Sequence, residues 1–392
     1  MRDPSSAASS RISQFEGRVS EFKSILEADG GANQIAVDRA ISELRSGRPV
    51  IVRFGRNHVI VTSVETLEPR LAAKLEGLAK GRARLILAAP RLRRLGLERT
   101  EPGHFALPKI DLARIAALSL EVGARFDAPV ASLSAIEKAV MELLRLSLIL
   151  PAAVVAPVTA RTAADSGLML ADANAIFEYR GRKVVDLKIV GRAPVPLEGA
   201  PDTEFVVFRG GEGLRDQVAI LIGKPDFSKP VSVRLHSACL TGDLFGSLKC
   251  DCGDQLRDTA KFMAQNGGGV LLYLDQEGRG NGLSNKMRAY KLQAQGFDTY
   301  DADEVLGFDH DQRGFDFAAE MLKQIGVQSV RVMTNNPIKI AALRAAGLDI
   351  VSDQRVLGRT NDHNVRYLAS KRDRAGHIID VDQLTAYGAV KE

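Results

Sequence analysis

Two α/β domains are the fold that this sequence of 392 residues predicts, the second of them built on a mixed sheet. The length is sufficient for two hydrophobic cores. Helical and strand periodicities alternate along the chain, as they do in α/β folds. A segment rich in proline and glycine, residues 191–204, interrupts the alternation and is the expected linker. We therefore expect a disordered tail at 1–15, a first domain at 16–190 and a second at 191–392.

Composition narrows the functional classes. Hydrophobic residues make up 45% and charged residues 26%, as in ordinary globular proteins. Aromatic residues are only 5%, which disfavours a base-stacking surface, so no nucleic-acid partner is expected. The net charge of +5 suits a small anionic substrate as well as an anionic polymer, so it does not distinguish the two. Three clustered cysteines indicate a reducing compartment, and no apolar run or leader is evident, so we expect a cytoplasmic protein without membrane contact.

The elements of the first domain follow from local patterns. A helical apolar spacing covers 35–44, and two short strands, 49–55 and 58–64, follow it. A helix at 69–76 is expected to end before Gly77. Further elements are expected as a strand at 83–88, a helix at 135–148, a strand at 152–158 and a short helix–strand piece at 176–187. The basic run between Lys80 and Arg99 is interpreted as a solvated face rather than an anion or RNA site.

The second domain begins with antiparallel-looking strands and then alternates. The strands are expected at 204–210, 218–223, 231–236, 270–274, 330–334 and 348–351. The helices are expected at 254–265, 285–295, 315–325 and 338–346. A loop is expected to extend to Gly314 between the second and third helices.

All three cysteines of the chain lie within one short window, as Cys239, Cys250 and Cys252. Three thiolates are ligands that Zn²⁺ accepts tetrahedrally. Three protein ligands leave a position for water, as in catalytic zinc sites, whereas four close the site. The spacing leaves both arrangements open, because His236 stands three residues before the first cysteine. Buried cysteines without metal are the third alternative.

Two downstream motifs favour an anionic ligand. Glu277-Gly278-Arg279-Gly280 follows a strand directly, so its glycines allow close backbone approach and Arg279 can fork onto a phosphate. Thr334-Asn335-Asn336-Pro337 joins a strand to a helix whose N-terminus favours an anion, with Lys339 one turn further. A plain turn and a well-capped helix are the alternatives.

Taken together, these motifs resemble GTP cyclohydrolase II. The resemblance covers about residues 225–380 and includes RLHSACLTGDLFGSLKCDCGDQL, QEGRG, the loop with Asp311 and Arg313, and TNNPIKI. It implies a catalytic zinc ion, one per chain, and Mg²⁺ with the phosphates of GTP. It also implies that the imidazole ring of GTP is opened and that formate and diphosphate are released. The product is then the first intermediate of riboflavin biosynthesis, and the enzyme is expected to be a homodimer.

The resemblance also implies residue roles. Cys239, Cys250 and Cys252 match the zinc ligands, Asp311 the proton acceptor, Arg313 the nucleophile on phosphorus and Tyr290 a residue at the reacting end of the purine. The matching nucleotide-binding positions are Arg234, His236, Gln255, Glu277, Gly278, Arg279, Thr299, Thr334 and Lys339. Because a guanidinium is protonated at neutral pH, Arg313 could instead stabilise charge on the phosphates.

Four positions depart from the family pattern. Ala238 stands for the usual Glu, Asp275 for Arg, Asn281 for Ile and Ser284 for Leu. The changes at Ala238 and Asn281 motivate one alternative, a related hydrolase that opens another base, such as that of a uracil nucleotide. A non-catalytic nucleotide-binding regulator is the second alternative.

The first domain resembles, weakly, 3,4-dihydroxy-2-butanone-4-phosphate synthase. The similar stretches are AVDRAISELRSGRPVIV, RLRRLGL and EPGHFALP. The acidic loop of that family is replaced by RFGRNHVIV, and its His-Thr-Glu motif falls on Ile136-Glu137-Lys138. Without a carboxylate cluster for Mg²⁺, we expect a degenerate, inactive domain.

Overall fold

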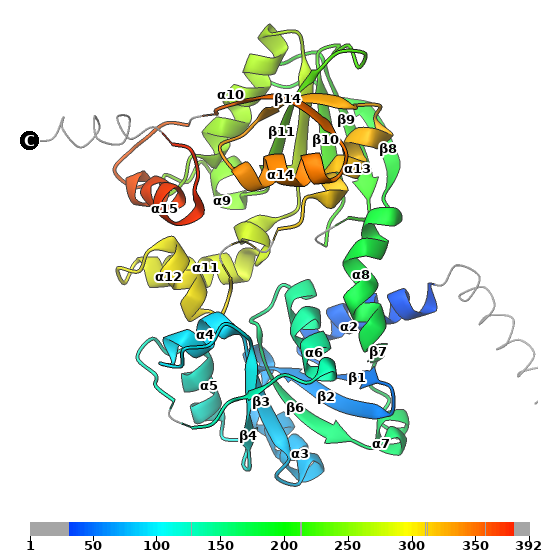
Figure 1. The fold of residues 1–392 in the computed structure, drawn as a ribbon, viewed down its shortest axis with the longest axis vertical. Coiled ribbons are helices and arrows are strands. Elements are labelled where there is room, and N and C mark those ends of the chain that lie inside the picture. The colour runs from blue at the N-terminus through cyan, green and yellow to red at the C-terminus, as the bar shows by residue number, and fades with distance from the viewer. Residues whose placement is uncertain are drawn as a thin grey trace, which may run out of the picture.

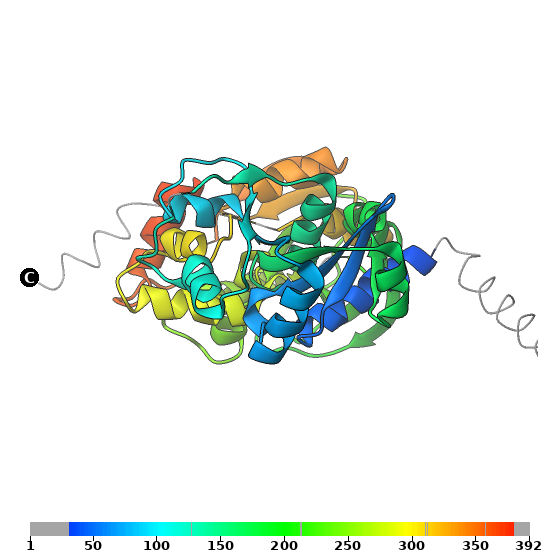
Figure 2. The ribbon, with the colours of Figure 1, turned by 90° about the horizontal axis from the view of Figure 1, so that it is seen from below.

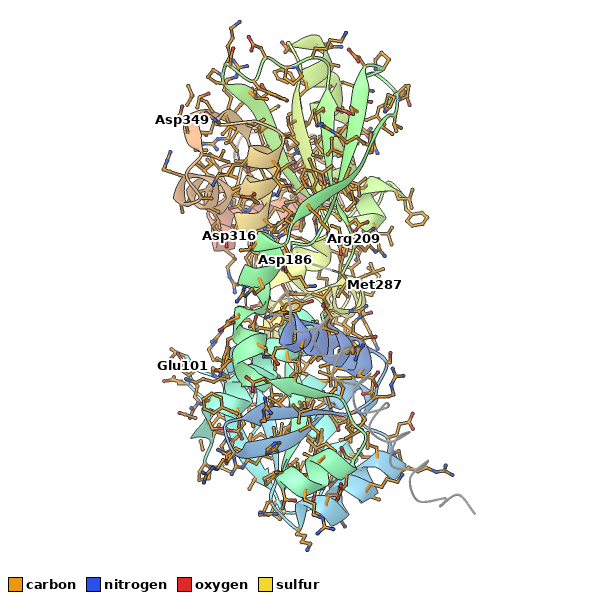
Figure 3. All side chains as sticks on the ribbon, turned by 90° about the vertical axis from the view of Figure 1, so that its right-hand side faces the viewer. Glu101, Asp186, Arg209, Met287, Asp316 and Asp349 are labelled. Carbon is orange, nitrogen blue, oxygen red and sulfur yellow. The ribbon has the colours of Figure 1, made fainter. Side chains whose placement is uncertain are left out.

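The protein, described here as a computed structural model, forms two lobes that lie one above the other (Figure 1). The structure describes residues 31–126, 128–211, 214–309, 311, 313–356 and 358–379, so the tail predicted at 1–15 lies outside the described residues. Each lobe contains one seven-stranded sheet, which confirms the prediction of two α/β domains. Figure 3 shows the same two lobes from the side, with Asp186, at the end of the connecting helix, between them.

The first sheet is almost entirely antiparallel. Its strands are β1 (Val50–Phe54), β2 (Asn57–Ser63), β3 (Ala83–Leu87), β4 (Gly103–Leu107), β5 (Ala131–Ser132), β6 (Ala152–Val158) and β7 (Leu170–Asp172). Their order across the sheet is β5-β4-β3-β6-β2-β1-β7, and β1 and β7 form the parallel pair. Val50, Val52 and Val61 are buried with no exposed surface, as expected of strands covered on both faces.

Helices cover both faces of this sheet. They are α2 (Ala32–Arg45), α3 (Pro69–Ala79), α4 (Ala89–Arg94), α5 (Leu112–Leu120), α6 (Ala135–Leu146), α7 (Ala160–Asp165) and α8 (Ala173–Val185), with the 3₁₀ turn η1 (Val64–Thr66). Helices α2, α6 and α8 share one apolar core, and α3 and α5 share the other. The end predicted for α3 is wrong, because the helix continues through Gly77 and closes at Lys80 in a left-handed conformation, φ 48°. The sequence patterns did not reveal α4, β4 or α5.

The second sheet combines antiparallel and parallel pairing. Its strands are β8 (Lys188–Pro194), β9 (Thr203–Arg209), β10 (Gln217–Ile222), β11 (Val231–Ser237), β12 (Gly269–Leu274), β13 (Ser329–Met333) and β14 (Asp349–Gln354). The order is β14-β13-β11-β12-β10-β9-β8, in which β11 runs parallel to both β12 and β13. The segment predicted as the linker instead forms the end of β8 and its turn into β9, and α8 runs from one lobe to the other (Figure 1).

Seven helices and one 3₁₀ turn complete the described part of this domain. They are α9 (Leu240–Asp243), α10 (Cys252–Gln265), η2 (Glu277–Gly280), α11 (Leu283–Gln293), α12 (Thr299–Val305), α13 (Asp316–Gln324), α14 (Pro337–Ala345) and α15 (Val365–Ala375). Helix α12 lies where the sequence predicted only a loop, and α15 was not foreseen. Among the helices that the structure describes, none combines the length and apolarity that crossing a membrane requires.

Helices α11 and α12 pack directly against the first domain. Leu150 belongs to the same apolar cluster as Ala289 and Leu292 of α11 and Val305 of α12. The basic run between Lys80 and Arg99 is a solvated face only in part. Lys80, Arg82 and Arg84 are exposed, as predicted. Arg91, Arg93 and Arg94 instead contact α12. Periodicity could not show this, since the acidic partners lie about 200 residues further along the chain.

Candidate active site

A cavity of about 310 Å³ opens at the carboxyl ends of β11, β12 and β13. The carboxyl ends of parallel strands commonly form ligand sites, because the chain turns away from the sheet there. All of the predicted site residues line this cavity. They are Arg234, His236, Cys239, Cys250, Cys252, Gln255, Glu277, Gly278, Arg279, Tyr290, Thr299, Asp311, Arg313, Thr334 and Lys339.

The three cysteines form a compact cluster at one end of the cavity. Cys239 follows β11, and Cys252 is the first residue of α10. The Sγ atoms of Cys239 and Cys250 are 3.7 Å apart, and all three sulfurs lie within 4.8 Å of one another. Thiolates bound tetrahedrally to Zn²⁺ at ~2.3 Å lie ~3.8 Å apart, so the cluster fits a zinc ion. Gly242 permits the approach, because a Cβ there would lie 2.7 Å from Cys250 Sγ.

His236 does not complete the cluster. Its Nε2 lies 3.1 Å from both carboxylate oxygens of Asp243, which also accepts hydrogen bonds from the Cys239 amide at 2.9 Å and from the Tyr273 hydroxyl at 3.0 Å. Within the described ranges, the group of candidate metal ligands comprises the three cysteines only. The geometry therefore favours an open three-cysteine site over one closed by His236.

Lys286 links the cysteines to the loop that follows β12. Its ammonium donates to Cys239 Sγ at 3.1 Å and to Glu277 Oε1 at 2.7 Å. Burial by itself lowers the pKa of Lys286, but the charges of Cys239 and Glu277 outweigh burial and raise the pKa. Hydrogen bonds from Cys250 and Cys252 hold the pKa of Cys239 well below that of a free thiol. The site thus stabilises a thiolate before any metal is considered.

The loop after β12 is strained. Gly278 and Arg279 both have φ near +61°, a region that costs a non-glycine residue roughly 1–2 kcal/mol. This backbone turns the Arg279 side chain toward α12, where it donates to the Thr299 carbonyl at 3.2 Å and to the Asp303 carboxylate. Its guanidinium also stacks on Tyr300, 4.4 Å from the ring centroid. Strain of this kind is characteristic of functional sites.

Two buried cations also line the cavity, Arg234 and Lys339. Arg234 donates to Gln255 Oε1 at 2.5 Å and to the Met333 carbonyl at 3.2 Å, and burial lowers its pKa to about 10. Lys339, one turn into α14, donates to the Leu235 carbonyl at 2.7 Å. Burial and the charges of Arg313 and Arg234 hold the pKa of Lys339 well below its usual range. Cations that repel one another in this way would bind an anionic ligand favourably.

Asp311 and Arg313 form a bidentate ion pair. Arg313 Nε donates to Asp311 Oδ1 at 2.8 Å, and Nη2 donates to Oδ2 at 2.5 Å. Arg313 Nη1 also donates to Ser237 Oγ at 3.2 Å. Burial by itself would raise the pKa of Asp311 and lower the pKa of Arg313. The ion pair outweighs burial, so that the pKa of Asp311 is lowered and the pKa of Arg313 is raised. Both groups are therefore charged at neutral pH.

Of the four departures from the family pattern, Ala238 and Asn281 line the cavity. Asp275 instead accepts hydrogen bonds from the amides of Leu214 and Arg215, at 2.9 and 3.0 Å. Its carboxylate thus binds the backbone of residues 214 and 215, and Asp275 does not line the cavity. Ser284 is exposed on α11 and does not line the cavity.

Several cavity residues were missed by the sequence reasoning. Asp303 and Tyr300 lie on α12, and Tyr367, Lys371 and His377 lie on or just after α15. The N-cap Asp298, which accepts from the Tyr300 and Asp301 amides at 2.7 Å, is the signal that could have located α12. No comparable motif marks α15, whose amphipathic polar sequence resembles an ordinary surface helix.

Comparison with known proteins identifies the second domain. The GTP cyclohydrolase II family profile matches residues 188–355. A GTP cyclohydrolase-2 from Xylella fastidiosa (strain Temecula1) is 42% identical over 364 residues, 91% of this chain and 90% of that protein. The riboflavin biosynthesis protein RibBA of Cytophaga hutchinsonii is 45% identical over 178 residues, 45% of this chain and 44% of that protein.

Solved structures are less similar. The crystal structure of RibBX, a two-domain 3,4-dihydroxy-2-butanone 4-phosphate synthase from A. baumannii, covers 82% of this chain and 99% of its own, with a TM-score of 0.32 and 14% identity. A likeness of that size supports no argument about the first domain. The similarity to the Xylella protein, in contrast, extends over nearly the whole of both chains. The chain therefore belongs to the GTP cyclohydrolase II family.

Proposed function

We propose that the second domain hydrolyses GTP to formate, diphosphate and 2,5-diamino-6-(5-phosphoribosylamino)pyrimidin-4(3H)-one, the first step of riboflavin biosynthesis. One observation carries the proposal: the three cysteine sulfurs, the buried cations and the Asp311–Arg313 pair all face one cavity. The names of the relatives support the same reaction and pathway.

Zinc would be held by Cys239, Cys250 and Cys252, whose spacing fits it. When bound, zinc supplies Lewis acidity and lowers the pKa of water that it coordinates. Lys286 and the Asp243 carboxylate keep Cys239 in place from two sides. Such supporting contacts orient ligands and tune a metal site.

The remaining residues of the chain would bind and orient the nucleotide. Arg234, Arg279 and Lys339 are the cations that can bind the triphosphate, together with Mg²⁺ held mainly by the phosphates. At the cysteine end, burial raises the pKa of Tyr290 to about 12, so its hydroxyl stays protonated and can donate a hydrogen bond to the reacting ring. Glu277, already paired with Lys286, can accept one from the base.

Arg313 is proposed to stabilise charge on the phosphates, with Asp311 accepting a proton from attacking water. The bidentate ion pair supports this assignment, because it keeps the guanidinium protonated and therefore a poor nucleophile. Trapping a phosphorylated Arg313 during turnover would instead establish the nucleophilic role.

The test is an assay of the zinc-loaded protein with GTP and Mg²⁺, following formate and the absorbance of the pyrimidine product. We expect formate and pyrimidine in equal amounts. Turnover of UMP without turnover of GTP would assign the site to a uracil nucleotide, as the altered Ala238 allows. Nucleotide binding without turnover of either would indicate a regulator.

The first domain is proposed to lack synthase activity. We place the first domain at residues 16–190 and the second at 191–392. No group of candidate metal ligands occurs among its described residues. Formation of 3,4-dihydroxy-2-butanone 4-phosphate from ribulose 5-phosphate would contradict this.

We also propose a cytoplasmic homodimer, for which light scattering should give twice the chain mass of 42.3 kDa.

A further inference from the structure

Two faces of helix α12 contact different parts of the molecule. Thr299, Tyr300 and Asp303 line the cavity. Asp301, Glu304 and the carbonyl of Val305 lie on the other side and contact α4 of the first domain. Helical spacing separates the two sets, since residues three or four apart share a face. Figures 1 and 2 show α4, α12 and α15 on the same side of the molecule, and in Figure 1 α12 lies between the other two.

Glu304 of α12 forms two ion pairs with the first domain. Arg93 Nη2 lies 3.2 Å from Glu304 Oε1, and Arg94 Nη2 lies 3.1 Å from Glu304 Oε2. Arg94 also pairs with Asp301. The side chain of Glu304 is only 16% exposed, so solvent screens these pairs less than it screens a surface ion pair.

Arg91 makes a second, buried connection. Its side chain is 2% exposed, and its guanidinium donates to the carbonyls of Leu118 at 2.7 Å, Ala117 at 2.9 Å and Glu121 at 2.8 Å. A further hydrogen bond reaches the Val305 carbonyl at 3.1 Å. One cation therefore covers the carboxyl ends of α5 and α12, where unpaired carbonyls and the helix dipole favour positive charge.

The same helix holds a cation of the cavity. Arg279 donates to the Asp303 carboxylate and the Thr299 carbonyl and stacks on Tyr300, so three of its contacts are to α12. A rotation or shift of α12 would consequently move the guanidinium of Arg279. A misplacement of about 1 Å of a binding group is enough to affect turnover strongly.

We propose that Arg91 and Arg94 of the first domain are positioning residues for the nucleotide site, which act through α12 and Asp303 on Arg279. The first domain thereby supports the activity of the second without chemistry of its own. The inference rests on the proposed function only in taking Arg279 as a nucleotide contact.

The main test is Arg94→Glu, which reverses one charge on a partly exposed side chain. We expect KM for GTP to rise on the order of tenfold, with kcat changed much less, because binding geometry rather than the zinc site is disturbed. The matched control is Arg53→Glu, which breaks an ion pair with Asp172, 3.0 Å away, inside the first domain. This control should leave KM unchanged.

Rescue distinguishes positioning from a general loss of stability. Glu304→Arg alone should raise KM, because it faces Arg93 and Arg94. Adding Arg94→Glu restores one opposite-charge pair with residue 304 but leaves a carboxylate beside Asp301, so KM should return part of the way toward the unmodified value. Arg91→Lys, which cannot reach both helix ends at once, should also raise KM if the variant folds. Failure of rescue, with both variants equally impaired, would overturn the proposal.

A readout independent of turnover is hydrogen exchange at the amides of residues 299–305. Arg94→Glu should accelerate exchange there and leave the strands of the second sheet protected, whereas Arg53→Glu should not. Unchanged exchange and unchanged KM in Arg94→Glu would refute the positioning role. If the unmodified protein does not turn over GTP, the proposed function fails, and exchange still decides whether Arg94 holds α12.

Discussion

The two domains contain sheets of the same size, and the buried Glu137 of the first differs from two buried charges of the second. In the first, the buried Glu137 is satisfied within the domain, by the Ser134 amide at 2.9 Å and by Arg84 at 3.0 Å. In the second, Lys339 and Asp303 are buried with pKa values shifted toward their neutral forms. A fold retains such unfavourable groups where a ligand compensates for them. This difference supports the proposal that the nucleotide binds in the second domain.

Backbone strain occurs in both domains, but of the described non-glycine residues with positive φ only Arg279 lines the cavity. The loop of η2 places Gly278, Arg279 and Gly280 in succession at positive φ, beside the cavity. In the described part of the first domain, Lys80 and Leu148 are the non-glycine residues with positive φ. Lys80 closes a helix, and the Leu148 carbonyl accepts a hydrogen bond from Asn285 of α11 at 3.2 Å. Even this strained residue of the first domain serves the contact with the second.

The largest effect is expected from Cys252→Ser. Loss of one of three ligands should abolish zinc retention and lower GTP turnover by at least about 100-fold, more than loss of a supporting contact does. Metal content by elemental analysis and formate release are the measurements. Leu248→Ser introduces the same residue at an exposed position of the same segment and should change neither. Full zinc content in Cys252→Ser would show that the cluster is not the metal site.

Next in size is the effect of replacing Arg313. If the guanidinium stabilises charge, Arg313→Ala should lower kcat roughly 100- to 1000-fold, and Arg313→Lys should retain a measurable part because it keeps the charge. Single-turnover release of diphosphate separates the two variants. Equal loss in both, with a phosphorylated arginine trapped in the unmodified enzyme, would favour a nucleophile.

A smaller effect is expected from Asp303→Asn, and it depends on pH. Burial, opposed by the charge of Arg279, raises the pKa of Asp303 from its ordinary value of 3.8 to about 6. Above pH 6 the carboxylate is ionised and holds Arg279. As the pH falls below 6 it takes up a proton, so KM of the unmodified enzyme should rise. In Asp303→Asn, KM should be raised about tenfold at all pH values, because a charged hydrogen bond is lost.

The same shift has a consequence for stability. The pKa of Asp303 is higher in the folded state than in the unfolded state, so this group favours folding most below pH 4. As the pH rises from 4 to 6 this contribution to the free energy of unfolding is lost, and the loss is about 3 kcal/mol at most. Urea unfolding of Asp303→Asn should lack that component. The exposed Asp349→Asn is the control, and identical pH profiles in all three proteins would contradict the assignment.

The smallest effect on catalysis is expected from Glu137→Gln in the first domain. The change weakens a capping box and the contacts with Arg84 and His104, so the free energy of unfolding should fall by about 1–3 kcal/mol. GTP turnover of the folded protein should be unchanged. A loss of turnover without loss of stability would show that Glu137 of the first domain contributes to catalysis in the second.

Much of the site could be anticipated from local sequence. The cysteine spacing, the glycines around Arg279 and the cap at Asn336 are short-range signals, because metal ligands, tight turns and helix starts impose residue types within a few positions. The roles of Asp303 and Arg91 could not be anticipated. Their partners are 24 and 214 residues away, at Arg279 and Val305, and no local pattern encodes such pairs.

The sequence by itself determined the class of the fold, the clustering of the three cysteines and the resemblance to the family. Periodicity and motif chemistry are properties of neighbouring residues, and these are visible in one dimension. Only the tertiary structure decided that His236 serves Asp243 rather than a metal, that Asp275 faces backbone, and that the basic run meets α12. Each of these outcomes depends on which groups come into contact when the chain folds. A buried charge without a partner is strongly destabilising, and the packing of both domains determines which partner it contacts.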